Sequence, residues 1–312
     1  MNYLAMTAPR RDRATFRAFV NTNAELALNR TSTPEARFAN ARNLAVYGGH
    51  PRAELVPRAE DYRGLDMGRS LDLFRSRMDS AKGMTYIFVG DFDVEAIKPL
   101  LATWVATLPV ADLPLQVRDP GIRQVAGVTR REVRAGTEQK SVVSFDFGSD
   151  LAYSKEEALA FQTMIDVLNI RIRAALRDRH QLIYTGSAVG RYARIPRPSY
   201  SLSIVLPTAP QHVEKLETVL WEDIVELQGS GPTPAELNKA KQAMLQTYRK
   251  SVKENAYWKQ RLESAELEGE DPRDILTMEQ RLDAVTAAQV QAAARRFLDR
   301  ERYVEMVLKP EA

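Results

Sequence analysis

Two stretches of the chain, 220 residues apart, follow the same order of helices, turns and strands. When Leu65–Phe88 is placed on Val285–Leu308, a predicted helix falls on a predicted helix, and the strand-like MTYIFV falls on VEMVL. The dipeptide Pro51-Arg52 falls on Pro272-Arg273 at nearly the same offset. Self-similarity of this kind predicts one supersecondary unit that is used twice.

The two copies differ in their β content. Residues 1–110 contain about three predicted helices but one clear strand, Met84–Gly90, an apolar run rich in β-branched and aromatic residues. A lone strand leaves its backbone groups without partners. Either the chain is a fragment of a longer protein, or this strand pairs outside its own unit. Helix signals in this part include a Thr33 N-cap before Pro34 and an Asp93 N-cap.

The second half predicts a complete α+β domain. Its expected strands are 125–133, 141–147, 182–192, 200–206 and 303–308. Its expected helices begin after the N-cap signals Ser154, Thr233 and Thr286, each with Glu or Gln three residues on, and also cover 211–227. The helix after Thr233 is expected to run to about Glu268. We therefore predict a partial, mostly helical copy over 1–110, a linker over 111–120, and an α+β domain of antiparallel sheet packed against helices over 121–312.

Composition excludes several classes of protein. The 44 basic and 41 acidic residues give a net charge of +3 without clustered cations, which argues against a nucleic-acid partner. There are no cysteines, so disulfides and thiolate metal sites are absent. No apolar stretch is long enough to span a bilayer, and the start MNYLAMTAPRRD has no signal-peptide pattern. We therefore expect no membrane partner.

The stretch 171–192 has the clearest potential for chemistry. It is predicted to be the end of an amphipathic helix, a turn and a strand, with Arg177 and Tyr184 on either side of the corner. Such a corner can carry a guanidinium and a phenol into one cleft. The alternative is that arginines at a helix end only complement the helix dipole on a solvated surface, and that the tyrosine packs at the rim. The arginines concerned are Arg171, Arg173, Arg177 and Arg179.

Small residues follow Tyr184 along the predicted strand. By period-two alternation, Tyr184, Gly186, Ala188 and Gly190 share one face, where an extended substrate could approach closely. The alternative is a strand face that packs on a helix.

A zinc site is not predicted. The three histidines, His50, His180 and His212, do not begin or end an H-x-x-E-H motif, which places two zinc-binding histidines and a general base on one helix face.

Three segments together carry a resemblance to a known family. MNYLAMTAPRRDRATF, YIFVGDFDVEAIKPLLATWVATLP and RIRAALRDRHQLIYTGSAVG resemble the C-terminal half of pitrilysin/insulinase-type zinc peptidases. The most similar branch is the bacterial PqqL-like one, related to mitochondrial processing peptidase. The resemblance implies four similar α+β domains in two halves that close around a peptide, with zinc in the first domain. This chain would hold the back of the third domain and all of the fourth.

The resemblance also implies a site and partners. Arg177 and Tyr184 match the Arg and Tyr that the family's second half brings to the substrate carbonyl, with Arg173 and Arg179 as alternates. No cofactor is expected in this chain; zinc would lie in the missing half or a partner subunit. The expected partners are that zinc-bearing half and a peptide, and the chain alone should be inactive. A periplasmic or secreted parent protein is suspected, while the compartment and the substrate stay open.

Two other functions fit the sequence. One is a catalytically inert scaffold or peptide-binding module of the same fold. The other is an unrelated α+β interaction domain, which the absence of the predicted sheet would favour. An H-x-x-E-H segment encoded upstream or in an adjacent gene would favour the peptidase.

Overall fold

We describe the fold from a computed structural model, whose described residues are 2–53, 57–113 and 116–311. The helices are α1 (Asn2–Thr7), α2 (Arg13–Asn29), α3 (Pro34–Tyr47), α4 (Ala59–Arg63), α5 (Met67–Met78), α6 (Val94–Trp104), α7 (Lys155–Ile172), α8 (Val213–Ser230), α9 (Pro234–Ser251), α10 (Asn255–Glu268), α11 (Met278–Asp283) and α12 (Ala287–Phe297). The strands are β1 (Val128–Arg134), β2 (Ser141–Asp150), β3 (Ser187–Ala193), β4 (Ser199–Thr208) and β5 (Tyr303–Lys309).

The chain divides into two compact units. One contains Met1–Arg30, Val56–Arg118 and Glu254–Glu266; the other contains Thr31–Leu55, Asp119–Lys253 and Leu267–Ala312. The helices follow the predicted repeat: at an offset of 221 residues α2 falls on α9 and α3 on α10, and at 220 α5 falls on α12. Helices α3 and α10 correspond to each other in the repeat, but α3 belongs to the second unit and most of α10 belongs to the first. The assignment of 1–110 and 121–312 to two domains of a larger protein stays a prediction.

All five strands belong to the second unit and form one sheet, in the order β1-β5-β2-β4-β3. The α+β class is confirmed, but the prediction of an antiparallel sheet is wrong for one pair. The C-terminal strand β5 lies between β1 and β2, antiparallel to β2 and parallel to β1, with Val128 opposite Tyr303. Consecutive strands that pair through a hairpin are antiparallel. Here β5 separates β1 from β2, so these two strands do not form a hairpin.

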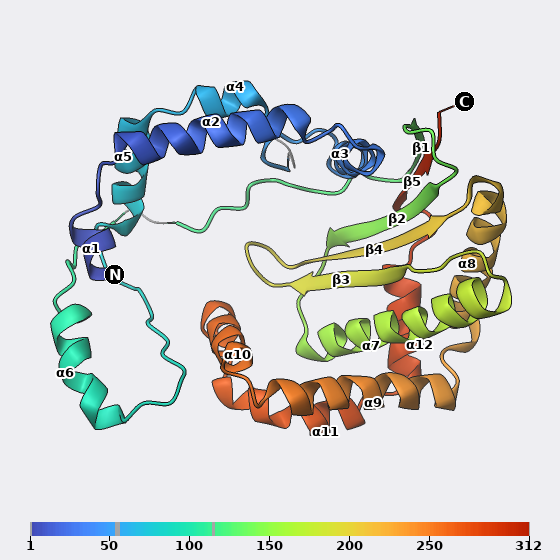
Figure 1. The fold of residues 1–312 in the computed structure, drawn as a ribbon. Helices are drawn as coiled ribbons and strands as arrows, with labels where there is room; N and C mark the ends of the chain where they lie inside the picture. The colour runs from blue at the N-terminus through green and yellow to red at the C-terminus, as the bar shows by residue number, and fades with distance from the viewer. Residues whose placement is uncertain (1, 54–56, 114–115, 312) are drawn as a thin grey trace. The chain divides into compact units, whose positions relative to one another are not determined.

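Both faces of this sheet are partly covered (Figure 1). The larger core packs helices α7, α8 and α12 against β2, β4 and β5, with Phe145, Leu168 and Phe297 buried at its centre. On the opposite face α3 covers β1 and β5, where Phe38 packs near Met306. The alternation of β5 side chains between the two cores is the pattern expected of a strand buried on both sides.

Most predicted helix starts are confirmed, but one forms differently. Thr233 and Glu236 exchange the predicted capping-box bonds, as do Thr286 and Gln289. Ser154 accepts the N–H of Glu157, yet the Glu157 carboxylate accepts the Tyr192 hydroxyl at 2.6 Å.

The backbone N–H of Ser154 donates to the same Tyr192 hydroxyl, so a tyrosine from β3 completes the start of α7. The predicted long helix from Thr233 to Glu268 is also wrong, because α9 ends at Ser251 and α10 begins at Asn255.

The predicted strand Met84–Gly90 is absent, and the structure places no strand beside it among the described residues. A strand exists only through pairing, so an apolar extended run alone does not suffice. The side chain of Phe88 is 46% exposed, and α6 has no buried residue although it carries Leu100 and Trp104. The first unit therefore presents apolar surface. Within the described ranges, no helix combines the length and apolar character that crossing a membrane requires.

Candidate functional site

Helix α7 delivers the chain to the predicted corner. Leu168 and Ile172 anchor its buried face, and Leu176 continues that face into a π-helical turn over Arg173–Arg179. The turn ends when the Leu182 N–H donates to the Leu176 carbonyl at 2.7 Å. π-Helical turns widen the backbone spiral and recur at functional sites.

The arginines of this helix end divide into two kinds. Arg171 is buried and donates to both carboxylate oxygens of Glu236, at 2.9 and 3.0 Å. It is therefore a structural ion pair, not a solvated helix-end cation. Arg173, Arg177 and Arg179 are exposed.

The corner is fixed on both sides of Tyr184. Gln181 takes a left-handed φ of 53°, and the next two residues, Leu182 and Ile183, are buried. The Thr208 hydroxyl donates to the Leu182 carbonyl at 2.6 Å, and Ile183 forms an isolated bridge to Thr208. A non-glycine residue with positive φ is uncommon and persists where its surroundings fix it.

Tyr184 itself stands outside the sheet. Tyr184 is 96% exposed. It lies in a bend three residues before β3, which begins at Ser187. The predicted strand 182–192 is therefore wrong at this position. Gly186 holds the chain on the other side with a φ of 148°, where a Cβ would lie 2.8 Å from Leu206 Cδ2. A large aromatic side chain is thus projected into solvent from a short loop that is anchored at each end.

Arg177 lies on the last turn before this loop. Its guanidinium donates to the Asp178 carboxylate at 2.9 Å, and that hydrogen bond raises the pKa of Arg177 above its ordinary value. Among the described interactions none joins Arg177 to Tyr184. The structure places both side chains at one exposed helix-to-strand corner, and their role at a substrate stays a prediction.

The small-residue face of β3 is packed against α7. A Cβ on Gly190 would lie 2.4 Å from Ile165 Cδ1 and 2.7 Å from Phe161 Cζ, and Ala188 is 1% exposed. The alternative interpretation, a strand face packed on a helix, is therefore confirmed for these two positions. Close approach of an extended substrate to this face is excluded by α7.

The residues present do not fit a zinc site. Over the described ranges, no group of three or more His, Cys, Asp or Glu side chains is placed to hold a metal ion. The sequence likewise lacks the H-x-x-E-H motif.

The sheet and the helices packed on it form an α+β unit, and comparison with protein families identifies its class. The profile of the peptidase M16 inactive domain matches residues 70–244, which is more than half of the chain. The chain therefore belongs to this family, and its recognition as a zinc-less half of an insulinase-type peptidase is confirmed.

Solved structures share the fold. The periplasmic protease PqqL from Escherichia coli superposes with a TM-score of 0.82 at 16% identity, over 96% of this chain and 33% of that one. A protease from Helicobacter pylori gives 0.82 at 14%, over 99% and 75%. The peptidase M16 inactive domain from Pseudomonas fluorescens gives 0.79 at 17%, over 99% and 73%.

At these identities the likeness concerns the fold alone. The chain spans about a third of the length of PqqL. A search of curated proteins returned no match.

Proposed function

We propose that this chain is the non-catalytic half of an M16 metallopeptidase, which helps to enclose a peptide and brings Arg177 and Tyr184 to its carbonyl group. The zinc-bearing half would be a separate segment or subunit. The observation that carries the proposal is the 96% exposure of Tyr184 on a loop pinned at Ile183 and Gly186. Such a side chain contributes no burial to this chain, so its anchored projection is explained by contact with another molecule.

The chemistry suits an acyl-transfer transition state. When water attacks a peptide carbonyl, negative charge grows on the carbonyl oxygen. A phenol O–H or a guanidinium N–H aimed at that oxygen donates a hydrogen bond that strengthens as the charge develops. One such donor typically accelerates turnover by about 10²–10³-fold. Arg177 could alternatively hold a neighbouring substrate carbonyl with its planar fork of donors.

The first unit supports the need for another half. Its segment 84–89 has the composition of a strand but no strand beside it among the described residues. Phe88, Leu100 and Trp104 are exposed apolar side chains of the same unit. These side chains are available for contact with another half of the protein.

The test is complementation. The purified chain is assayed against unfolded peptides, with and without added zinc, and then with a zinc-bearing M16 half encoded upstream or in an adjacent gene. The proposal expects no hydrolysis by this chain alone and hydrolysis by the mixture. Chelator-sensitive hydrolysis by this chain alone would contradict it.

A catalytically inert scaffold is the second candidate. The observation that favours it is the hydrogen bond between Arg177 and Asp178, which occupies the guanidinium without any substrate. A zinc-loaded, associated mixture that binds peptides but does not cleave them would support the scaffold.

A further inference from the structure

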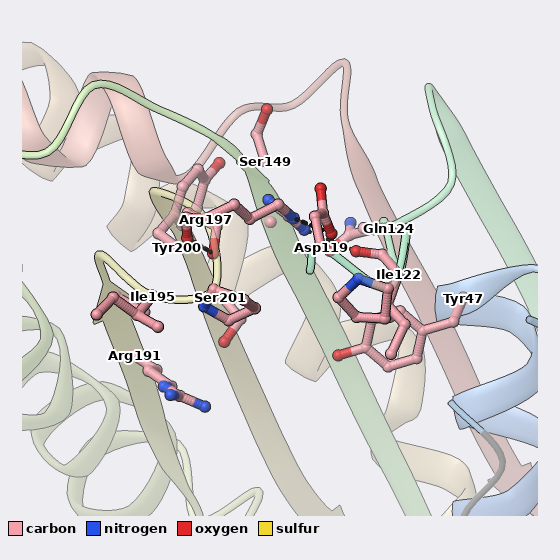
Figure 2. A pocket seen from close by; sticks show the side chains of 15 residues that line it. Tyr47, Asp119, Ile122, Gln124, Ser149, Arg191, Ile195, Arg197, Tyr200 and Ser201 are labelled. Atoms are coloured by element: carbon pink, nitrogen blue, oxygen red, sulfur yellow. Dashed lines mark hydrogen bonds and ion pairs between the residues drawn. The ribbon is translucent and has the colours of Figure 1, made fainter. Parts of the chain in front are cut away.

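A hollow in the sheet-bearing unit lies at the end of β3 away from Tyr184 (Figure 2). It measures about 240 Å³ and lies between the end of α3, the segment 119–124, the end of β2 and the β3–β4 hairpin. Lining residues that matter here are Tyr47, Gln124, Gly148, Arg191, Ile195 and Ser201.

Two charged lining residues, Asp119 and Arg197, form ion pairs with each other and with Arg123 and Asp150 beside the hollow. Arg123 donates to Asp150 at 3.0 Å and to Asp119 at 3.0 Å, and Arg197 donates to Asp150 as well. The hydrogen bond from Arg123 lowers the pKa of Asp119 to about 2, so Asp119 is ionised at neutral pH. Both arginines are thus held in ion pairs with the two aspartates.

Arg191 is the excess cation. Its side chain is exposed at the hollow, and Figure 2 draws no interaction from it to the other lining residues. Among the described residues no ion pair or hydrogen bond of the Arg191 guanidinium is found, whereas its backbone belongs to the β3–β4 ladder. Ser201 lies directly opposite Arg191 in the β3–β4 pair, so both side chains share the face that lines the hollow.

The floor and walls supply shape. Gly148 forms the floor, where a Cβ would lie 2.7 Å from Gln124 Oε1, so backbone alone fits there. Ile195 and the ring of Tyr47 supply apolar wall. The hollow is smaller than the roughly 300–1,000 Å³ of drug-sized ligand sites, which limits an occupant to about one or two amino-acid residues.

We propose that this hollow binds the C-terminal carboxylate of a peptide that ends in an apolar residue. The planar fork of Arg191 matches the two carboxylate oxygens, and the Ser201 hydroxyl can donate a third hydrogen bond. Among the lining residues Arg191 is the single cation without an ion-pair partner, which suits a monoanion, whereas a phosphate with close to two charges would require a second such cation in the lining. The apolar wall receives the last side chain. This inference does not depend on Arg177, Tyr184 or catalysis.

The test is direct binding to the full chain without any partner. N-acetyl-alanyl-leucine is titrated as its free acid and as its C-terminal amide, with backbone and arginine side-chain NMR signals followed. The free acid is expected to shift the signals of Arg191 and Ser201 saturably and to bind at least about tenfold more tightly than the amide.

Variants locate the contact. Arg191→Ala is expected to weaken binding of the acid by about tenfold or more, and Arg191→Lys to retain part of it, because a point charge lacks the fork. Arg131→Ala on β1 is the matched control, since Arg131 is an exposed strand arginine outside the hollow, and it should bind as the wild type does.

Three outcomes would overturn the proposal. They are equal binding of acid and amide, unchanged binding by Arg191→Ala with an unchanged melting temperature, and tighter binding of inorganic phosphate than of the acid. The last result would make the hollow a phosphate site.

Discussion

Asn169 closes the outer edge of β3 by exchanging two hydrogen bonds with the backbone of Ala188. The side-chain amide donates to the Ala188 carbonyl at 2.9 Å, and the Ala188 N–H donates back to Asn169 Oδ1 at 2.8 Å. An unpaired edge strand is a template for another strand, and this contact occupies the N–H and carbonyl that Ala188 would offer to one. An incoming strand would therefore meet the Asn169 side chain at this position.

Replacing Asn169 by Ala should destabilise the chain by about 1–3 kcal/mol, because the buried N–H and carbonyl of Ala188 lose their partners. Urea unfolding measures the change. Gln162→Ala, at an exposed position of the same helix, is the control and should cost less than about 0.5 kcal/mol. Equal unfolding of the two variants would show that Asn169 does not secure the edge.

Gly190→Ala should destabilise the chain by about 1–3 kcal/mol, because the new methyl group collides with Ile165 and Phe161 in the α7 interface. Gly229→Ala is the matched control. It lies in the last turn of α8 with no atom within 4 Å of its Cβ position, so it should be neutral or slightly stabilising. Calorimetric melting of both variants compares them. An unchanged melting temperature for Gly190→Ala would mean that β3 and α7 are not packed as described.

Glu217 should make stability depend on pH. Burial, followed by the nearby charge of Glu305, raises the pKa of Glu217 from 4.5 to about 7. Because the folded state then holds this proton more tightly than the unfolded state, the contribution is fully present below about pH 4.5. It is lost as the pH rises to about 7.

As the pH rises from about 4.5 to about 7, the free energy of unfolding should fall less for Glu217→Gln than for the wild type. The expected difference is on the order of 1 kcal/mol, because solvent screens a half-buried carboxylate. Chemical unfolding at pH 5 and pH 8 measures the difference. Glu222→Gln, exposed on the same helix, is the control and should follow the wild type. Identical pH dependence of wild type and Glu217→Gln would refute the assignment.

Local signals predicted most of the second unit. Thr233 and Thr286 start their helices as expected, and the predicted strands 200–206 and 303–308 form as β4 and β5. These signals depend only on residues close together in the sequence, so they can be recognised without knowing the tertiary structure. The parallel pairing of β1 with β5 joins residues about 175 positions apart, as Arg130 and Glu305 show, and no local pattern specifies it.

The first unit and the site depended on distant partners. MTYIFV has the composition of a strand, but pairing decides whether a strand forms, and none lies beside it among the described residues. The corner at Arg177 and Tyr184 was predictable from the change between helical and strand patterns. Its bend was not, because it depends on the contacts of Ile183 and Gly186 with β4. The hollow at Arg191 joins four separate segments and gave no sequence signal.

The role of Tyr184 is tested most directly by peptide turnover in the complex of this chain with its zinc-bearing half. Tyr184→Phe removes one hydroxyl from a 96% exposed residue, so the melting temperature should not change. We predict a fall of about 10²-fold in kcat with zinc content and association unchanged. Arg177→Ala should also lower kcat or raise KM, whereas Arg179→Ala, two residues away and also exposed, should not.

If Arg179→Ala lowered kcat and Arg177→Ala did not, the functional arginine would be Arg179, about half a helical turn further along the chain. Wild-type turnover by Tyr184→Phe and Arg177→Ala in a verified, active complex would contradict the account, and the corner would then be structural.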